Sequence, residues 1–460
     1  MTERLRRALF DERDAAGLAF FRVLLGVLGC VSALRFLHYG WVDEFFVRPT
    51  FFFHHWFAPF ARPLGAAGMH AVFWTMALSG ALVALGLAYR LAIVTFFVTI
   101  TYVQLADVTN YLNHYYLVSL LALLMCVMPL GRAYSLDALL FPATRRATLP
   151  GWCSVLLKVQ VGTVYTYAGV AKITTDWLLH AQPLDIWLAS RTGLPVIGPA
   201  LALPFMPYVM AWAGCLFDLT IAGWLTWRRS RPYAFAVVLF FHFMTSQLFP
   251  IGMFPVIMVV GATTFFDASW PRRFLPRRLA AAPAQGPRVV PHRALVALGA
   301  AYCALQLLLP LRAFLYGGDV LWHEQGMRFS WRVMVREKNA SVTYLVENPR
   351  TGRVVEVPPR LYLDGRQQRE LGTQPDLVLQ LAHKIAADYA QKEGGPVRVR
   401  ADVLVSLNGR RAARLIDPDV DLATVEDGLA PKAWILPAPT TRPPYLHAPS
   451  WNSSTSASRR

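Results

Sequence analysis

Nine apolar runs separated by short polar loops fill the first two thirds of the chain. A helix that crosses a lipid bilayer needs about 20 mostly apolar residues. Runs near that length cover residues 16–38, 67–88, 91–109, 112–131, 151–173, 205–227, 232–248, 251–267 and 293–313. This pattern predicts a polytopic α-helical membrane domain of about nine transmembrane helices over residues 1–316. The first run shows no small-residue cleavage site, so we interpret it as a retained transmembrane helix.

From about Gly317 onward the chain has the pattern of a small aqueous α+β domain, which we place at residues 317–438. Short alternating segments predict strands over Ser330–Val335, Ser341–Val346 and Val354–Pro358. A helix is expected from Pro375 to Lys392, capped by Thr373 and ended at Gly394. Asn408-Gly409 indicates a hairpin turn between residues 397–407 and 412–416. Residues 439–460 are rich in Pro, Ser and Thr and predict a disordered tail.

Composition and charge agree with a membrane protein. Hydrophobic residues make up 55% of the 460 residues, charged residues only 16%, and the formal net charge is +17. A basic chain can bind nucleic acid, but these arginines cluster in alternate loops, as membrane orientation requires. The clusters follow every second apolar run: Arg90; Arg132, Arg145 and Arg146; Arg228, Arg229 and Arg231; Arg272 and Arg273. We therefore expect no nucleic-acid partner, a cytoplasmic N-terminus and a C-terminal domain outside the cytoplasm.

The five cysteines do not predict a disulfide framework or a metal site. Each lies in or beside an apolar run, and no two form a C-x-x-C pair. Thiol–disulfide chemistry and a cysteine-based zinc site are therefore not expected.

Ionisable residues inside the fifth run are candidates for function, because charges within a membrane are unfavourable. Lys158, Gly162, Tyr165, Gly169 and Lys172 share one helix face, and the glycines allow close approach of a neighbour. For Lys158 we favour a structural ion pair with Asp218. For Lys172, a pair with Asp176 or extension of its amine to the membrane surface stays as open as a functional role.

Two further polar groups lie on the predicted outer side with Lys172. Asn110, Asn113 and His114 occur among aromatic residues between the third and fourth runs. His242, Thr245, Ser246 and Gln247 end the seventh run, where helix–helix hydrogen bonding is the simpler interpretation. A neutral histidine, an asparagine and a buried lysine are groups that can deprotonate a phenolic hydroxyl and hold its anion.

Six ordered motifs resemble the vitamin K-dependent gamma-glutamyl carboxylase family over nearly the whole chain. They are residues 109–117, 165–172 with Asp176-Trp177, 241–254, 269–271, 329–335 and 416–421. The Ala- and Arg-rich composition suggests a bacterial member of the carboxylase-like HTTM group, in the inner membrane. The resemblance implies a carbon–carbon lyase that uses vitamin K hydroquinone of menaquinol type, O2 and CO2, without a metal. Its implied partners are membrane lipid, a quinone and a glutamate-containing protein or peptide.

The resemblance also assigns residues. Lys172 matches the family's base, and Asn113 and His114 match its polar pair. Met334 matches a segment beside the quinone, and Arg366 or Arg369 matches an arginine that holds the glutamate carboxylate. Further candidates for substrate binding lie in the matched motifs: Tyr165, His242, Thr245 and Gln247.

Departures from the animal enzymes keep two alternatives open. Thr245 replaces an asparagine, residues 336–338 carry different charges, and the sequence ends soon after Pro437. The first alternative is a quinol epoxidase or oxygenase that does not carboxylate glutamate. The second is a non-enzymatic membrane scaffold or lipid-handling protein.

The arginine distribution makes the topology testable. A reporter fused after Val420 should be active only if it functions outside the cytoplasm, because the arginine-rich loops stay inside. Reporters placed after Arg146 supply the opposite control. Cytoplasmic activity of the Val420 fusion would contradict the predicted orientation.

Overall fold

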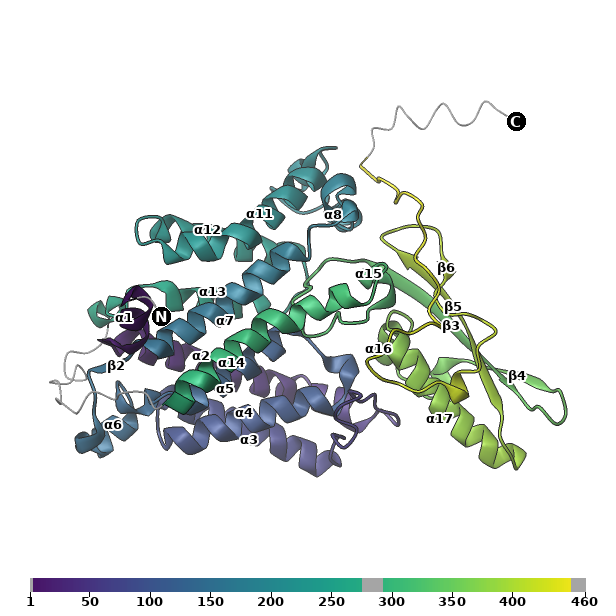
Figure 1. Ribbon diagram of the computed structural model, residues 1–460, viewed down its shortest axis with the longest axis horizontal. Helices are drawn as coiled ribbons and strands as arrows, with labels where there is room; N and C mark the ends of the chain where they lie inside the picture. The colour runs from purple at the N-terminus through teal and green to yellow at the C-terminus, as the bar shows by residue number, and fades with distance from the viewer. Residues whose placement is uncertain (1–2, 275–292, 448–460) are drawn as a thin grey trace. The chain divides into compact units, whose positions relative to one another are not determined.

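The computed structural model describes residues 3–274 and 293–447 and divides the chain into two compact units. Unit 1 comprises Met1–Thr166 and Thr220–Leu309, and unit 2 comprises Tyr167–Leu219 and Pro310–Arg460. Figure 1 labels their helices and strands. Each unit is described separately.

Helices occupy all nine predicted apolar runs. They are α2 (Ala16–His38), α3 (Ala66–Leu85), α4 (Tyr89–Ala106), α5 (Asn113–Val127), α7 (Gly151–Val170), α11 (Met206–Thr226), α12 (Arg231–Leu248), α13 (Phe254–Ala262) and α14 (Arg293–Leu308). Among the described residues, five segments are long and apolar enough to cross a membrane: α2, α3, α4, α11 and Ala294–Leu315. The apolar helices Asn113–Val127 and Phe254–Phe265 are shorter. The chain is thus a helical multi-pass membrane protein with about five candidate spans, and nine spans are not shown.

Close backbone packing joins α2 to α3 in unit 1. A Cβ on Gly26 would lie 2.4 Å from the backbone nitrogen of Ala84, and one on Gly80 would lie 2.7 Å from that of Cys30. No side chain fits at either position, and small residues are how membrane helices approach closely. The α4 and α5 helices extend this bundle (Figure 1).

A buried arginine holds together the loop of unit 1 that contains residues 130–134. Arg22, in α2, is 0% exposed. Its Nη atoms donate to the carbonyls of Leu130 at 2.8 Å and Tyr134 at 2.6 Å, and also to those of Ala133 and Ala84. The planar guanidinium satisfies several diverging carbonyls at once, which a compact ammonium cannot do.

The C-terminal domain in unit 2 is built on an antiparallel sheet. Its strand order is β4-β3-β5-β6, with bounds Val354–Val357, Lys338–Glu347, Arg398–Leu407 and Ala413–Arg414. The helices α16 (Gly365–Leu371) and α17 (Pro375–Glu393) complete the domain, and α17 packs on β3 and β5 (Figure 1). The α+β prediction is therefore confirmed.

Some local predictions in this domain are confirmed and others are wrong. The Asn408-Gly409 hairpin and the end of α17 at Gly394 are confirmed, each with a positive φ at the turn. The strand predicted over Ser330–Val335 is wrong, because Phe329, Trp331 and Met334 adopt left-handed backbone angles of 61°, 60° and 50°. Thr373 is not the cap either: the N-cap of α17 is Gln374, and the Thr373 hydroxyl donates to the Glu370 carbonyl.

The start of the predicted tail is ordered against α9 (Leu184–Ala189). The buried carboxylate of Asp185 accepts hydrogen bonds from the backbone nitrogens of Leu446 and His447 and from His447 Nδ1 at 2.6 Å. The rest of the predicted tail, residues 448–460, lies outside the described residues.

A buried ion pair ties α8 (Thr175–His180) to the hairpin turn within unit 2. Asp176 accepts from both Nη atoms of Arg410, at 2.6 and 2.5 Å, and from Asn408 Nδ2 at 2.7 Å. Burial raises the pKa of Asp176, but the hydrogen bonds from Arg410 and Asn408 outweigh it and leave the pKa below its ordinary value. The pair thus stabilises the fold while the carboxylate is ionised.

Replacing Arg22 should destabilise unit 1. In Arg22→Met, several buried carbonyls lose their donor, and each unsatisfied group costs about 1–3 kcal/mol. The thermal unfolding midpoint of the purified protein should fall clearly, and Arg22→Lys should not restore it. Arg229→Met, at an exposed arginine, is the matched control. Equal midpoints for all variants would contradict the structural role.

Replacing Arg410 should destabilise unit 2 in a pH-dependent way. Arg410→Gln leaves a largely buried carboxylate without its cation, a change of about 3 kcal/mol. Because the folded-state pKa of Asp176 is depressed, the difference from wild type should be full above the ordinary aspartate pKa of about 3.9. It should decline below that pH and be lost as pH falls through the lower folded-state pKa. Thermal midpoints across a pH series measure this. Arg411→Gln, at the exposed neighbour, should show no such dependence.

Candidate functional site

Close approach of α7 and α11 in unit 2 creates the surroundings of Lys172. A Cβ on Gly169 would lie 2.8 Å from the backbone nitrogen of Leu219, so only glycine fits there. The Cys215 thiol also lies 3.8 Å from the Gly169 carbonyl. This contact places residues 215–219 of α11 beside the C-terminal end of α7.

The amine of Lys172 lies in a buried polar cluster at that end. Its Nζ donates to Asp218 Oδ2 at 2.6 Å and to the Ala168 carbonyl at 3.1 Å, and both charged side chains are 8% exposed. The ring centroid of Trp177 lies 5.4 Å from Nζ, and the Trp177 indole N–H donates to the Ala211 carbonyl. A carboxylate, a carbonyl and an aromatic face therefore surround one amine.

This geometry corrects the predicted partner of Asp218 and excludes an ion pair between Lys172 and Asp176. The favoured Lys158–Asp218 pair is wrong, because Asp218 binds Lys172. Lys158 lies 11 residues before Gly169 on the same helix, about 16 Å along its axis. Asp176 does not pair with Lys172 either, since its carboxylate binds Arg410. The sequence identified both acids as possible partners of a lysine. Which lysine pairs with Asp218 depends on the helix contact at Gly169.

A second group of polar residues lies in unit 1. The Tyr165 hydroxyl and His242 Nε2 are 3.0 Å apart, and both side chains are buried. The ring of Phe254 lies 6.1 Å from those of His242 and His114. Three of the predicted residues, Tyr165, His242 and His114, thus share one aromatic environment. The buried histidines and the phenol can exchange hydrogen bonds with a flat polar ligand.

Other predicted residues of unit 1 lie at the edge of this group or beyond it. Asn113 is half-buried, and its Oδ1 accepts from the Tyr111 hydroxyl at 3.1 Å. The Thr245 hydroxyl donates to the carbonyl of His242, one turn earlier on α12. Gln247 is exposed, and its amide nitrogen donates to the Ser246 hydroxyl at 3.2 Å.

The remaining predicted residues lie in the C-terminal domain of unit 2. Met334 is half-buried and left-handed, in a loop where Gly326, Phe329 and Trp331 also have positive φ. Such strain in non-glycine residues concentrates at functional sites. The loop is therefore singled out by its backbone as well as by the motif at residues 329–335.

The two candidate arginines on α16 differ in their surroundings. Arg366 is half-buried and four residues before Glu370, whereas Arg369 is exposed. Burial raises the pKa of Glu370, against the opposing effect of Arg336 and Arg366. Arg336 in turn forms an ion pair with Glu324 at 2.8 Å. Sequence analysis missed these two acids, because neither stands in a recognisable motif.

Two family models match the chain and between them cover most of it. The HTTM domain model matches residues 10–270, and the model of the vitamin K-dependent gamma-carboxylase lumenal domain matches residues 291–441. No solved structure gave a significant match. The first model covers more than half of the chain, and the second matches the α+β domain, which is therefore lumenal in type. The chain belongs to the vitamin K-dependent gamma-carboxylase family, as a multi-pass membrane protein with an HTTM domain followed by the lumenal domain.

Proposed function

We propose that this protein is a vitamin K hydroquinone-dependent gamma-glutamyl carboxylase in which Lys172 removes the proton of a quinol hydroxyl. The observation that carries the proposal is the buried Lys172–Asp218 pair beside the face of Trp177. A buried amine next to an aromatic ring fits a flat phenolic ligand. Family membership supports an enzymatic, carboxylase-like activity.

The overall reaction that we propose balances without a metal. The quinol supplies the strong base through its reaction with O2 and leaves as the epoxide, with water as the other product. A glutamate γ-carbon loses a proton and forms a carbon–carbon bond with CO2. The residues of the protein bind and orient the reactants, exclude water and move the first proton.

Lys172 can accept a proton only after its ammonium has lost one. Burial disfavours the charged forms of both members of an ion pair. A neutral amine that is hydrogen-bonded to a neutral carboxylic acid therefore becomes accessible. The 2.6 Å contact lets the ammonium proton pass to Asp218. The amine then takes the quinol proton, and the resulting ammonium stabilises the quinol anion. The pair thus acts as one proton store.

The other candidates receive supporting roles in this proposal. His114 and Asn113, matched to the family's polar pair, supply neutral hydrogen bonds to a quinol oxygen. Tyr165 and His242 form a buried hydrogen-bonded pair suited to the same ligand class. Met334 lies in the strained loop that we assign to quinone contact. Arg366 or Arg369 binds the glutamate carboxylate, and Thr245 and Gln247 contact substrate.

Substitution of Lys172 tests the base directly. Lys172→Arg keeps the positive charge but cannot be deprotonated in a protein. It should therefore be as inactive as Lys172→Ala in epoxide formation from preformed hydroquinone, with both losing about 100-fold or more. Lys158→Arg, on the same helix, is the matched control. Substantial activity in Lys172→Arg would end the assignment, and His114 would become the next candidate.

Substitution of Asp218 tests the proton store. Asp218→Asn removes the internal acceptor, so the amine must lose its proton to solvent. The acid limb of the pH–rate profile for epoxide formation should then move to higher pH, and Asp218→Glu should restore it. An unchanged profile with a lower rate would show that Asp218 only holds the structure.

Labelled CO2 and a glutamyl peptide distinguish carboxylation from quinol oxygenation. The proposal expects label fixed in the peptide together with epoxide, and loss of both in Lys172→Ala. Epoxide without fixed label would select the oxygenase. If the folded protein forms neither epoxide nor labelled peptide, that result would favour a scaffold or lipid-handling role.

A further inference from the structure

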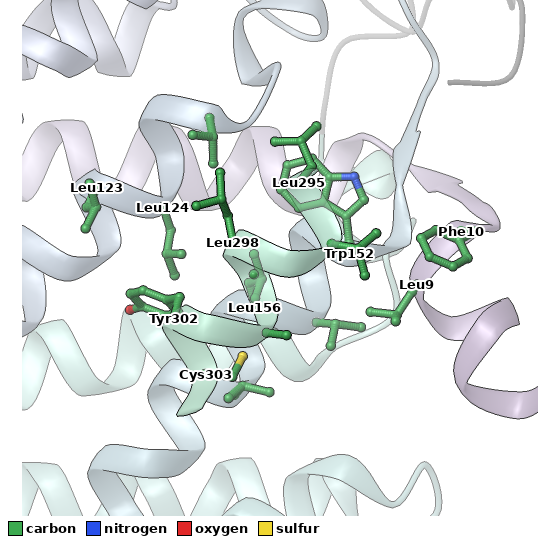
Figure 2. A pocket seen from close by; sticks show the side chains of 16 residues that line it. Leu9, Phe10, Leu123, Leu124, Trp152, Leu156, Leu295, Leu298, Tyr302 and Cys303 are labelled. Carbon is green, nitrogen blue, oxygen red and sulfur yellow. The ribbon is translucent and has the colours of Figure 1, made fainter. Parts of the chain in front are cut away.

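A large apolar cavity in unit 1 is lined by none of the polar residues assigned to the candidate site. It has a volume of about 520 Å³ and is lined by α1 (Glu3–Phe10), α5, α7 and α14. Figure 2 shows Trp152 and Leu156 of α7 facing Leu298 and Tyr302 of α14, with Leu9 and Phe10 of α1 at one end. On α7 the lining residues belong to the first three turns, from Trp152 to Val159. Tyr165 follows them by more than one further turn.

The chemistry of the lining suits a hydrocarbon chain. Aliphatic and aromatic side chains make up nearly all of it. The Tyr302 hydroxyl is already used, because it donates to Gln160 Oε1 at 2.5 Å. The volume lies within the usual range of small-ligand sites. Such a cavity binds apolar ligands by removing their surface from water or from looser lipid packing.

The cavity is open toward the lipid side of α14. Leu298 lines it and is still 66% exposed, and Leu295, one turn earlier, is 43% exposed. The span that contains α14 is only 11% buried within the structure. A lipid chain can therefore enter sideways from the bilayer.

Arginines lie beside two parts of the cavity lining, α1 and the C-terminal end of α5. Arg6 precedes Leu9 and Phe10 by three and four residues, which places it on their side of the helix. Arg6 and Arg7 share the single carboxylate of Glu3 at 3.0 Å each, so two cations face one anion. Asp11 and Glu12 follow the helix, in the turn and strand beyond it. Arg90 donates to the carbonyl of Cys126, next to the lining residue Val127.

The position of α1 is fixed by the start of α7. A Cβ on Gly151 would lie 2.2 Å from the carbonyl oxygen of Ala8, so the two backbones pack directly. The backbone N–H of Gly151 also donates to the Asp11 carbonyl at 3.0 Å. The arginines of α1 and the apolar cavity are therefore parts of one arrangement.

We propose that this cavity binds an acyl chain of an anionic phospholipid, whose phosphate is held by Arg6 and Arg7 of α1 and by Arg90. Guanidinium groups bind phosphate through charge-assisted hydrogen bonds, and basic residues beside a membrane helix attract anionic lipid. The lipid proposal uses none of the residues assigned to quinol chemistry and does not depend on that chemistry. The bound lipid fills the cavity and fastens α1 to α5, α7 and α14.

Native mass spectrometry of the full-length, delipidated protein tests the proposal. Phosphatidylglycerol or phosphatidylcholine is added at equal concentration. One phosphatidylglycerol should remain bound per chain, at least tenfold more tightly than phosphatidylcholine. Gly299→Phe should abolish this binding, because Gly299 lines the cavity and a Cβ there meets only Leu156, at 3.9 Å. The phenyl ring can therefore enter the cavity and occupy the space of the lipid chain. Ala304→Phe, at an exposed position outside the cavity, should bind as wild type does.

A triple substitution, Arg6→Gln, Arg7→Gln and Arg90→Gln, tests the headgroup. It should reduce phosphatidylglycerol binding to the level of phosphatidylcholine. Undiminished binding by folded Gly299→Phe would overturn the proposal. Equal affinity of wild type for the two lipids, or displacement of phospholipid by an isoprenoid quinone, would also overturn it.

Cys303 provides a measurement that needs no variant. Its thiol lines the cavity, so bound lipid should shield it. Added phosphatidylglycerol should slow the reaction of Cys303 with a small maleimide, followed by peptide mass spectrometry, whereas phosphatidylcholine should slow it less. Equal reaction rates with and without phosphatidylglycerol would contradict occupancy of the cavity.

Discussion

The candidate chemistry of this protein depends on one buried ion pair, between Lys172 and Asp218. The pair exists because Gly169 carries no side chain, which lets the backbone of α11 reach α7 at Leu219. Two charges in a dry site are unfavourable apart and tolerable together, so each requires the other. In the proposed mechanism, a proton moves from the amine to the carboxylate without any change in the total charge of the pair. A lysine on a lipid-facing helix surface would offer neither property.

The lumenal-type domain adds a second constraint in unit 2. The Asp176–Arg410 pair lies four residues after Lys172 and fastens α8 to the hairpin turn of the sheet. Trp177, the next residue, places its ring over the Lys172 amine. One short segment therefore carries the candidate base, an aromatic neighbour and an anchor to the domain. The aqueous domain is thus connected to the helix end that carries the candidate base.

The sequence predicted the helices well, because apolar length and loop arginines are local properties. Thus α2 has the bounds predicted for the first run, and the Asn408-Gly409 turn needs only two residues to be recognised. What failed depended on tertiary contacts. The sequence predicted Lys158 as the partner of Asp218, but the helix contact at Gly169 gives Asp218 to Lys172. The alternation in Ser330–Val335 resembled a strand, but its backbone is left-handed at Trp331 and Met334. Arg22 was missed because its partners are carbonyls of a distant loop.

The central claim is that Lys172 and Asp218 exchange and store a proton when a quinol binds. Infrared difference spectroscopy of the protein with hydroquinone under anaerobic conditions tests it most directly. If the amine takes the quinol proton while Asp218 holds the other, a carboxylic-acid C=O band should appear on binding and be absent in Asp218→Asn. A spectrum in which the quinol is deprotonated while Asp218 stays ionised, with no such band, would contradict the account.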